Sequence, residues 1–155
     1  MEEIRFYRAT GDYGFLSNLS PAEIEFEGRT FPCAEYAYQF GKPRDADVAE
    51  WLMAAPTPTL CAQAAHALVG WQIRADWAEI KVERMRAVLR AKFTQHPYWR
   101  GRLLRTGDAW LVEESSMDAF WGIGKKGVGK NMLGVLLMDV RSELSAVARV
   151  MEGLG

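Results

Sequence analysis

The amino-acid sequence predicts one predominantly helical α+β domain with a small antiparallel sheet, and three observations lead to this class. The 155 residues, of which 49% are hydrophobic and 25% charged, suffice for one compact core. Apolar residues recur at three- or four-residue steps in residues 76–95, which is typical of a helix. Residues 22–26 alternate apolar with acidic side chains before Glu27 and Gly28, and 29–31 resume the pattern, which predicts a hairpin. No linker or repeat interrupts residues 1–155, so a single domain is expected.

The other elements follow in order along the chain. A short strand at 4–8 precedes a loop at 11–21, whose turn formers enclose aromatic and apolar residues, so that it can pack over a site. Pro32 suits a helix start, and Pro43 ends the helix expected at 34–42. Further elements are expected as short helices at 45–54 and 58–69, a long helix at 76–95 with Asp76 as N-cap, a short helix after Pro97, a strand at 109–113 and a last helix at 131–149.

Charge and cysteine content exclude several classes of protein. Lysine plus arginine number 19 against 20 acids, so the net charge of -1 gives no general attraction to nucleic acid or to an anionic membrane. Cys33 and Cys61 lack metal-binding or redox spacing and are expected as buried free thiols, which favours a reducing cytoplasm. No apolar run approaches the ~20 residues that cross a bilayer. His66 and His96 have no second ligand at metal spacing, so no metal site is expected.

A polar row lies on the first predicted helix. Glu35, Gln39 and Lys42 stand at i, i+4 and i+7 and therefore share one face. A solvated face with a Glu-to-Lys pair is one interpretation. The neighbouring residues are mostly apolar, however, which suggests burial, and a buried carboxylate needs a partner or a function.

A second candidate site lies before the last helix. Residues 122–131 hold four glycines and three lysines, and backbone N–H groups at a helix start together with lysines form a phosphate cradle. A flexible surface loop is the alternative, since the Walker order is absent. Just upstream, Asp118 and Trp121 place a carboxylate and an indole beside the loop. That pair suits a sugar-phosphate whose base is stacked, although an indole in the core is the commoner arrangement.

Taken together and in this order, these motifs resemble the NADAR, or YbiA-like, family. The resemblance covers residues 6–144 and is carried by Phe6–Tyr7, Gly14–Asn18, Phe31–Gln39 with Lys42, Trp77–Met85, Leu89–Phe93, Asp118–Gly122 and Gly129–Met138. It implies hydrolysis of an N-glycosidic bond next to a phosphorylated ribose, without a cofactor. Members of the family cleave phosphorylated intermediates of riboflavin biosynthesis, and others remove ADP-ribose from modified guanine in nucleic acid.

The resemblance also implies roles for individual residues. The family's glutamate, lysine and aspartate match Glu35, Lys42 and Asp118, the three expected catalytic residues. Glu35 is expected as the principal acid/base and Asp118 as the group that directs water or holds ribose hydroxyls, with the reverse division also open. Two roles fit Lys42: binding phosphate, or trapping a ring-opened ribose as a Schiff base. The expected substrate-binding residues are Phe15, Ser17, Asn18, Gln39, Lys81, Trp121, Gly122, Lys125, Lys130 and Asn131.

Two positions depart from the family pattern and leave the substrate open. Tyr36 stands where a histidine commonly follows the glutamate. Glu114 occupies another polar position, near the aspartate, which is a histidine in some relatives. One alternative is an ADP-ribosyl glycohydrolase acting on modified guanine, because a single flipped nucleotide can enter a pocket without a broad basic surface. Another is a non-catalytic module that binds NAD or ADP-ribose. The expected partner is thus a small phosphoribosyl or ADP-ribosyl molecule, with nucleic acid only as a modified substrate.

Overall fold

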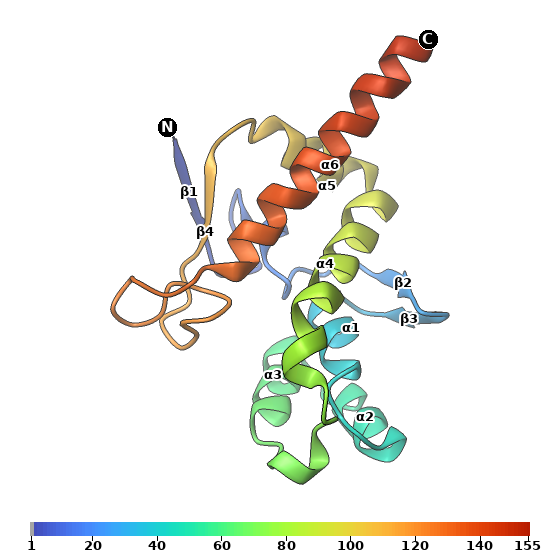
Figure 1. The fold of residues 1–155 in the computed structure, drawn as a ribbon, viewed down its shortest axis with the longest axis vertical. Helices are drawn as coiled ribbons and strands as arrows, with labels where there is room; N and C mark the ends of the chain where they lie inside the picture. The colour runs from blue at the N-terminus through green and yellow to red at the C-terminus, as the bar shows by residue number, and fades with distance from the viewer. Residues whose placement is uncertain (1) are drawn as a thin grey trace. The chain divides into compact units, whose positions relative to one another are not determined.

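The computed structural model describes residues 2–155, which form two compact units (Figure 1). Unit 1 comprises Met1–Ser17 and Phe93–Gly155, and unit 2 comprises Asn18–Lys92. Within the part of the chain that the structure describes, no helix is both long and apolar enough to cross a membrane.

Unit 1 combines a parallel strand pair with helices. Strand β1 (Glu3–Phe6) pairs in parallel with β4 (Trp110–Glu113), so that Ile4 lies opposite Leu111. Helix α6 (Met132–Leu154) contacts both β4 and α5 (Pro97–Arg105), and a 3-10 turn forms at Gly14–Leu16. Helix α6 has a buried apolar face, which consists of Leu133, Leu136, Leu137, Val140 and Leu144.

Unit 2 begins with the predicted hairpin. Strands β2 (Ile24–Phe26) and β3 (Arg29–Phe31) are antiparallel, and Glu27 and Gly28 both have positive φ, 52° and 78°. Two positive φ angles are what a two-residue type I′ turn requires, and this turn matches the twist of the strands. The unit continues with α1 (Ala34–Phe40), α2 (Ala46–Met53), α3 (Pro58–His66), a 3-10 turn (Gly70–Gln72) and the part of α4 (Trp77–Gln95) that ends at Lys92.

Helix α1 lies at the centre of unit 2, where it contacts α2, α3 and both hairpin strands. The core of this unit consists of Ile24, Phe31, Cys33, Ala34, Tyr36, Ala37, Leu52, Cys61, Ala65 and Val88. The prediction of buried, free cysteines is confirmed. Burial raises the pKa of the Cys61 thiol to about 12, so this thiol is unreactive near neutral pH. The packing of α1 on three sides fixes the polar row that it carries.

The structure differs from the sequence-based expectation in the sheet and at helix ends. The antiparallel hairpin was predicted, but the parallel pairing of β1 with β4 joins strands that lie about 100 residues apart and share no local pattern. Helix α6 continues to Leu154, five residues beyond the predicted end at residue 149, and α3 stops at His66 rather than 69. Helix ends depend on capping and tertiary contacts, so periodicity alone locates them poorly.

Candidate functional site

The predicted polar row on α1 is a hydrogen-bonded arrangement. Glu35 lies half-buried in the first turn, and its backbone N–H donates to the carbonyl of Asn18 at 3.1 Å. One turn later, Gln39 donates through Nε2 to Oε1 of Glu35 at 2.9 Å. Only 4% of Gln39 is exposed. The row is therefore not a solvated helix face, and its carboxylate is oriented by a buried amide.

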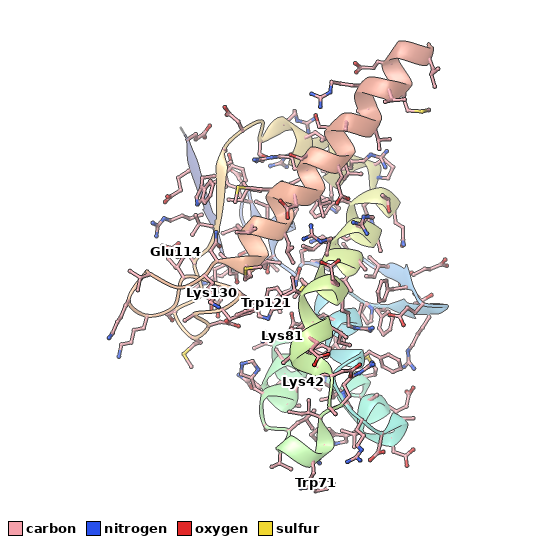
Figure 2. The ribbon with its side chains drawn as sticks, viewed as in Figure 1. Lys42, Trp71, Lys81, Glu114, Trp121 and Lys130 are labelled. Atoms are coloured by element: carbon pink, nitrogen blue, oxygen red, sulfur yellow. The ribbon has the colours of Figure 1, made fainter. Side chains whose placement is uncertain are left out.

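Lys42 follows directly after α1 and is half-buried. Its Nζ donates to the carbonyl of Ala65 at 2.8 Å. Burial and, to a smaller extent, the positive charge of Lys81 lower the pKa of Lys42, while Glu35 acts in the opposite direction. Figure 2 labels Lys42 and Lys81 on this unit. A lowered pKa increases the fraction of neutral amine near neutral pH, which is the nucleophilic form.

Two buried side-chain oxygens of unit 2 lack a hydrogen-bond donor among residues 2–155. They are Oε1 of Gln39 and Oδ1 of Asn18, whose side chains are 4% and 5% exposed. The Asn18 amide nitrogen makes only a weak contact of 3.1 Å to the sulfur of Met85. A buried acceptor without a donor costs roughly 1–3 kcal/mol, and such groups call for an explanation. A ligand that presents N–H or O–H groups would satisfy both acceptors.

The C-terminal end of α1 is held by Arg84 from α4. Its guanidinium donates to the carbonyls of Ala37 at 2.6 Å and Tyr38 at 3.1 Å, and forms an ion pair with Glu27 at 2.6 Å. A side chain at Gly41 would overlap this guanidinium and displace it from the end of α1. Arg84 was not among the predicted site residues. Arg84 lies in the Trp77–Met85 motif that carries the family resemblance, but no local pattern links it to the end of α1.

In unit 1, Asp118 forms a tight turn rather than projecting alone. Its Oδ1 accepts hydrogen bonds from the backbone N–H of Phe120 at 2.9 Å and of Trp121 at 2.8 Å. The half-buried indole of Trp121 packs edge-on against Phe120, with ring centroids 4.9 Å apart. Lys130 lies 5.6 Å from the Phe120 ring, and Figure 2 labels Trp121 and Lys130 in this region.

The glycine-rich loop uses many of its backbone N–H groups internally. Gly129 donates to Ile123 at 2.7 Å, and Gly124 donates to Ser115 at 2.9 Å. A side chain at Gly129 would lie 2.6 Å from the carbonyl of Ala119, so the glycine permits close packing of the loop. The cradle of free N–H groups that the sequence suggested is thus largely occupied by protein carbonyls. The exposed Lys125 and Lys130 side chains remain the phosphate-binding candidates of this segment.

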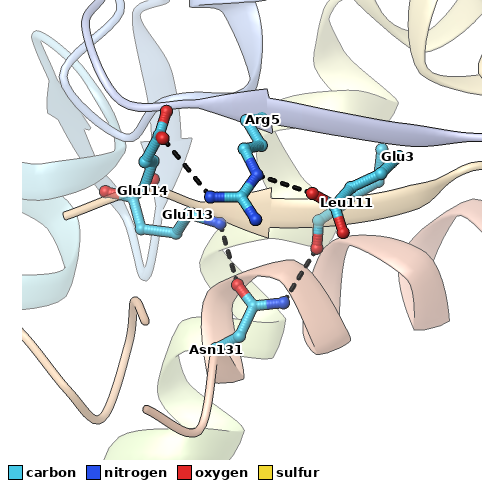
Figure 3. A network of polar contacts seen from close by, with 6 residues as sticks. All are labelled: Glu3, Arg5, Leu111, Glu113, Glu114 and Asn131. Carbon is cyan, nitrogen blue, oxygen red and sulfur yellow. Dashed lines mark hydrogen bonds and ion pairs between the residues drawn. The ribbon is translucent and has the colours of Figure 1, made fainter. Parts of the chain in front are cut away.

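Asn131 joins the loop to β4, as Figure 3 shows. Its Nδ2 donates to the carbonyl of Leu111 at 2.9 Å, and its Oδ1 accepts from the N–H of Glu113 at 2.8 Å. The residue has a left-handed backbone with φ 51°, which asparagine tolerates better than most residues. Both ends of the amide are therefore engaged by backbone. Glu114, the unusual family position, is exposed and faces Arg5 at 3.4 Å.

Phe15 and Ser17, also predicted to bind substrate, are buried in unit 1. Phe15 stacks on Trp99 with centroids 5.4 Å apart and an interplanar angle of 6°. The Arg102 guanidinium lies 4.9 Å from the same ring. The Phe15 ring is thus packed by protein groups. Gly122 is also buried, and a side chain there would lie 2.9 Å from the carbonyl of Glu113.

The structure therefore brings the predicted residues together in two sets. In unit 2, Glu35 hydrogen-bonds to Gln39 and Asn18. The charges of Glu35 and Lys81 both influence the pKa of Lys42. In unit 1, one folded segment holds Asp118, Trp121, Gly122, Lys125, Lys130 and Asn131.

Three comparisons with known proteins agree on one family. Residues 5–145, which include segments of both units, match the family model of the NADAR domain. The N-glycosidase YbiA of Escherichia coli K12 is 39% identical over 142 residues, covering 92% of this chain and 88% of that protein. A riboflavin biosynthesis protein of Vibrio vulnificus is 40% identical over 143 residues, 92% of this chain and 39% of that protein. The NMR structure of Escherichia coli YbiA matches with a TM-score of 0.85 and 38% identity, over 96% of this chain and 88% of that one.

Proposed function

The chain belongs to the NADAR family, and from this premise we propose that it cleaves the N-glycosidic bond of a phosphorylated riboside, such as a phosphoribosyl intermediate of riboflavin biosynthesis. Its class is that of a hydrolase acting on N-glycosyl compounds, as its relatives named N-glycosidase are, at 39% identity over most of the chain. The finer substrate assignment is supported by relatives named riboflavin biosynthesis proteins. The observation that carries the proposal is the Glu35–Gln39–Lys42 row, together with the unsatisfied acceptors on Gln39 and Asn18.

Glu35 is the carboxylate that we assign to acid/base chemistry. Cleavage of an N-glycosidic bond requires a proton on the leaving nitrogen and a water directed to the sugar. Glu35 is half-buried and held by the amide of Gln39, which fixes one of its oxygens and leaves the carboxylate oriented. In this proposal Gln39 Oε1 and Asn18 Oδ1 accept hydrogen bonds from substrate N–H or O–H groups.

Lys42 acts in this proposal as the nucleophile. In the ring-opened substrate C1′ is joined to the base nitrogen as an imine. Neutral Nζ adds to C1′ while Glu35 protonates the base nitrogen; Glu35 then takes a proton from Nζ and passes it to the same nitrogen, and the bond from C1′ to the base nitrogen breaks, which leaves a protonated Schiff base between Nζ and C1′. Water hydrolyses this Schiff base: its oxygen becomes the aldehyde oxygen of the released sugar phosphate, and its two protons restore the amine of Lys42 and the acid form of Glu35. The lowered pKa of Lys42 supports this role over phosphate binding, which needs the charged form.

Other assignments stay predictions. Lys81 lies near enough to Lys42 to influence its charge and suits the substrate phosphate. The sequence assigns Trp121 to the base and Lys125 and Lys130 to phosphate. Buried free thiols at Cys33 and Cys61 support a reducing compartment, so we place the enzyme in the cytoplasm.

The decisive experiment offers the protein several N-ribosides in parallel. They are the phosphorylated pyrimidine and pyrimidinedione ribosides of riboflavin synthesis, NAD, and an ADP-ribosylated guanine nucleotide, with release of the free base followed by mass spectrometry. We expect release from a phosphoribosyl compound, and a loss of at least about a hundredfold in Glu35→Gln. Glu25→Gln, at an exposed strand position of the same unit, is the matched control. Cleavage of the guanine adduct alone would instead establish the ADP-ribosyl glycohydrolase, and full activity of Glu35→Gln would refute the acid/base role.

A further inference from the structure

One carboxylate oxygen of Asp118 is engaged by its own turn. One oxygen, Oδ1, accepts two backbone hydrogen bonds, from Phe120 at 2.9 Å and from Trp121 at 2.8 Å. Aspartate commonly accepts from the N–H groups two and three residues later, because its short side chain reaches them without strain. The position of the Trp121 backbone, and hence of its indole, is therefore set by this carboxylate.

The same turn closes the glycine-rich loop onto the start of α6. Four successive carbonyls, of residues 119–122, accept hydrogen bonds from the four N–H groups of residues 130–133 at 2.8 to 3.0 Å. The first N–H groups of a helix have no partner within the helix. Here Met132 and Leu133 donate to Phe120 and Trp121, the two residues whose own N–H groups Asp118 binds. Asp118, the turn and the helix start form one continuous hydrogen-bonded unit.

The structure assigns Asp118 to positioning: its carboxylate holds Trp121 and the closed loop in place for substrate binding, and Glu35 alone carries the acid/base chemistry. This assignment rests on the proposed N-glycosidase function. It chooses one of the two divisions of roles between Glu35 and Asp118 that the sequence left open. A positioning role requires an acceptor at Oδ1 but no exchangeable proton. Asparagine supplies that acceptor but cannot act as an acid or base at these pH values. Alanine supplies neither the acceptor nor an exchangeable proton.

The kinetic test compares Asp118→Asn with Asp118→Ala on the phosphoribosyl substrate cleaved by the wild type. We expect Asp118→Asn to keep at least about a third of kcat/KM and the wild-type pH profile. Asp118→Ala should raise KM about tenfold, the scale of one lost base-stacking contact, with a smaller change in kcat. Asp108→Asn, an exposed aspartate of the same unit, is the matched control. The assignment is wrong if Asp118→Asn loses as much kcat as Glu35→Gln or loses one limb of the pH profile.

Amide hydrogen exchange provides a readout that needs no substrate. In Asp118→Ala the amides of Phe120 and Trp121, and those of residues 130–133, should exchange faster than in the wild type, while Asp118→Asn should stay close to it. Unchanged exchange in Asp118→Ala would overturn the positioning role even if catalysis were affected. If no N-riboside is cleaved by the wild type, the proposed function fails, and the exchange result still decides whether Asp118 holds the turn.

Discussion

Gln39 donates a hydrogen bond to the carboxylate of Glu35 across 2.9 Å, while its own carbonyl oxygen receives none from any residue in the described range 2–155. The amide thus has one end fixed by the proposed acid/base and the other end buried without a donor. Buried amides in a finished core have both ends satisfied. The unsatisfied end is what a stabilising core glutamine would not have, and the proposed role of Gln39 in binding substrate accounts for it.

Replacing Gln39 with methionine should separate stability from activity. Methionine keeps the volume and removes both the bond to Glu35 and the unsatisfied oxygen. We expect kcat/KM to fall at least about tenfold, the scale of a hydrogen bond to a charged group, while the free energy of unfolding stays the same or rises by up to about 1 kcal/mol. Steady-state kinetics and urea denaturation measure the two quantities. Gln63→Met on the exposed side of α3 is the control, and a large loss of stability with intact kcat/KM would contradict the prediction.

Borohydride added during turnover should trap the sugar on Lys42. The expected product is a protein whose mass increases by one reduced sugar phosphate, located at Lys42 by peptide mapping. Lys42→Arg should give no adduct, because the guanidinium is not a nucleophile at these pH values. Lys126→Arg, at an exposed loop position, should behave like the wild type. Turnover without any adduct would favour the alternative role, phosphate binding.

The pH profile should respond to Lys81. The positive charge of Lys81 contributes to the lowered pKa of Lys42. Its removal in Lys81→Met should raise the pKa of Lys42, so the neutral amine appears at a higher pH. The ascending limb of kcat/KM is therefore expected to move to higher pH in the variant. A limb that stays in place while KM rises would indicate that Lys81 contacts substrate without tuning Lys42.

Lys92 should make stability depend on pH. Its side chain is fully buried and donates to Ser20 at 3.0 Å, and burial lowers the pKa of Lys92 to about 7. The unfolded chain, with an ordinary lysine pKa of about 10.4, binds more protons than the folded chain above pH 7. Stability therefore rises with pH in this window, and the buried charge is most unfavourable below pH 7.

Urea denaturation of wild type and Lys92→Met between pH 6 and 8 tests this relation. Both proteins contain the same two cysteines, so ionisation of the thiols cancels in the comparison. The wild type should gain about 1 kcal/mol relative to the variant between pH 7 and 8. If the free energy of unfolding changed with pH in the same way in both proteins, the Lys92 ammonium would not be the source of the pH dependence. Lys126→Met serves as the exposed control.

Arg84→Lys should loosen the end of α1. Lysine keeps the charge but not the planar fork that reaches the carbonyls of Ala37 and Tyr38. We expect a loss of about 2 kcal/mol in the free energy of unfolding, because hydrogen bonds to charged groups contribute about 1.5–3 kcal/mol each and lysine retains part of them. Arg44→Lys, at an exposed position, is the comparison. If Arg84→Lys and Arg44→Lys were equally stable, the hydrogen bonds from Arg84 to the end of α1 would not contribute to stability.

Local patterns predicted much of this fold. The Glu27–Gly28 turn indicated the β2–β3 hairpin, and prolines on either side of α1 located that helix within two residues. The row of Glu35, Gln39 and Lys42 followed from helical spacing. The motifs that resemble the NADAR family added the function class, which the comparisons then supported. Each of these signals lies within a few residues of chain, where backbone geometry and spacing suffice.

The sequence by itself determined the helical elements, the hairpin, the family and the identity of the candidate catalytic groups. Only the tertiary structure decided that β1 pairs in parallel with β4, that Asn131 joins its loop to β4, and that Phe15 stacks on Trp99. It likewise placed Lys92 in a core and turned Asp118 toward its own backbone. The reason is physical: a local pattern records which face of an element is apolar, but the partner of that face is chosen by packing among residues far apart in the chain.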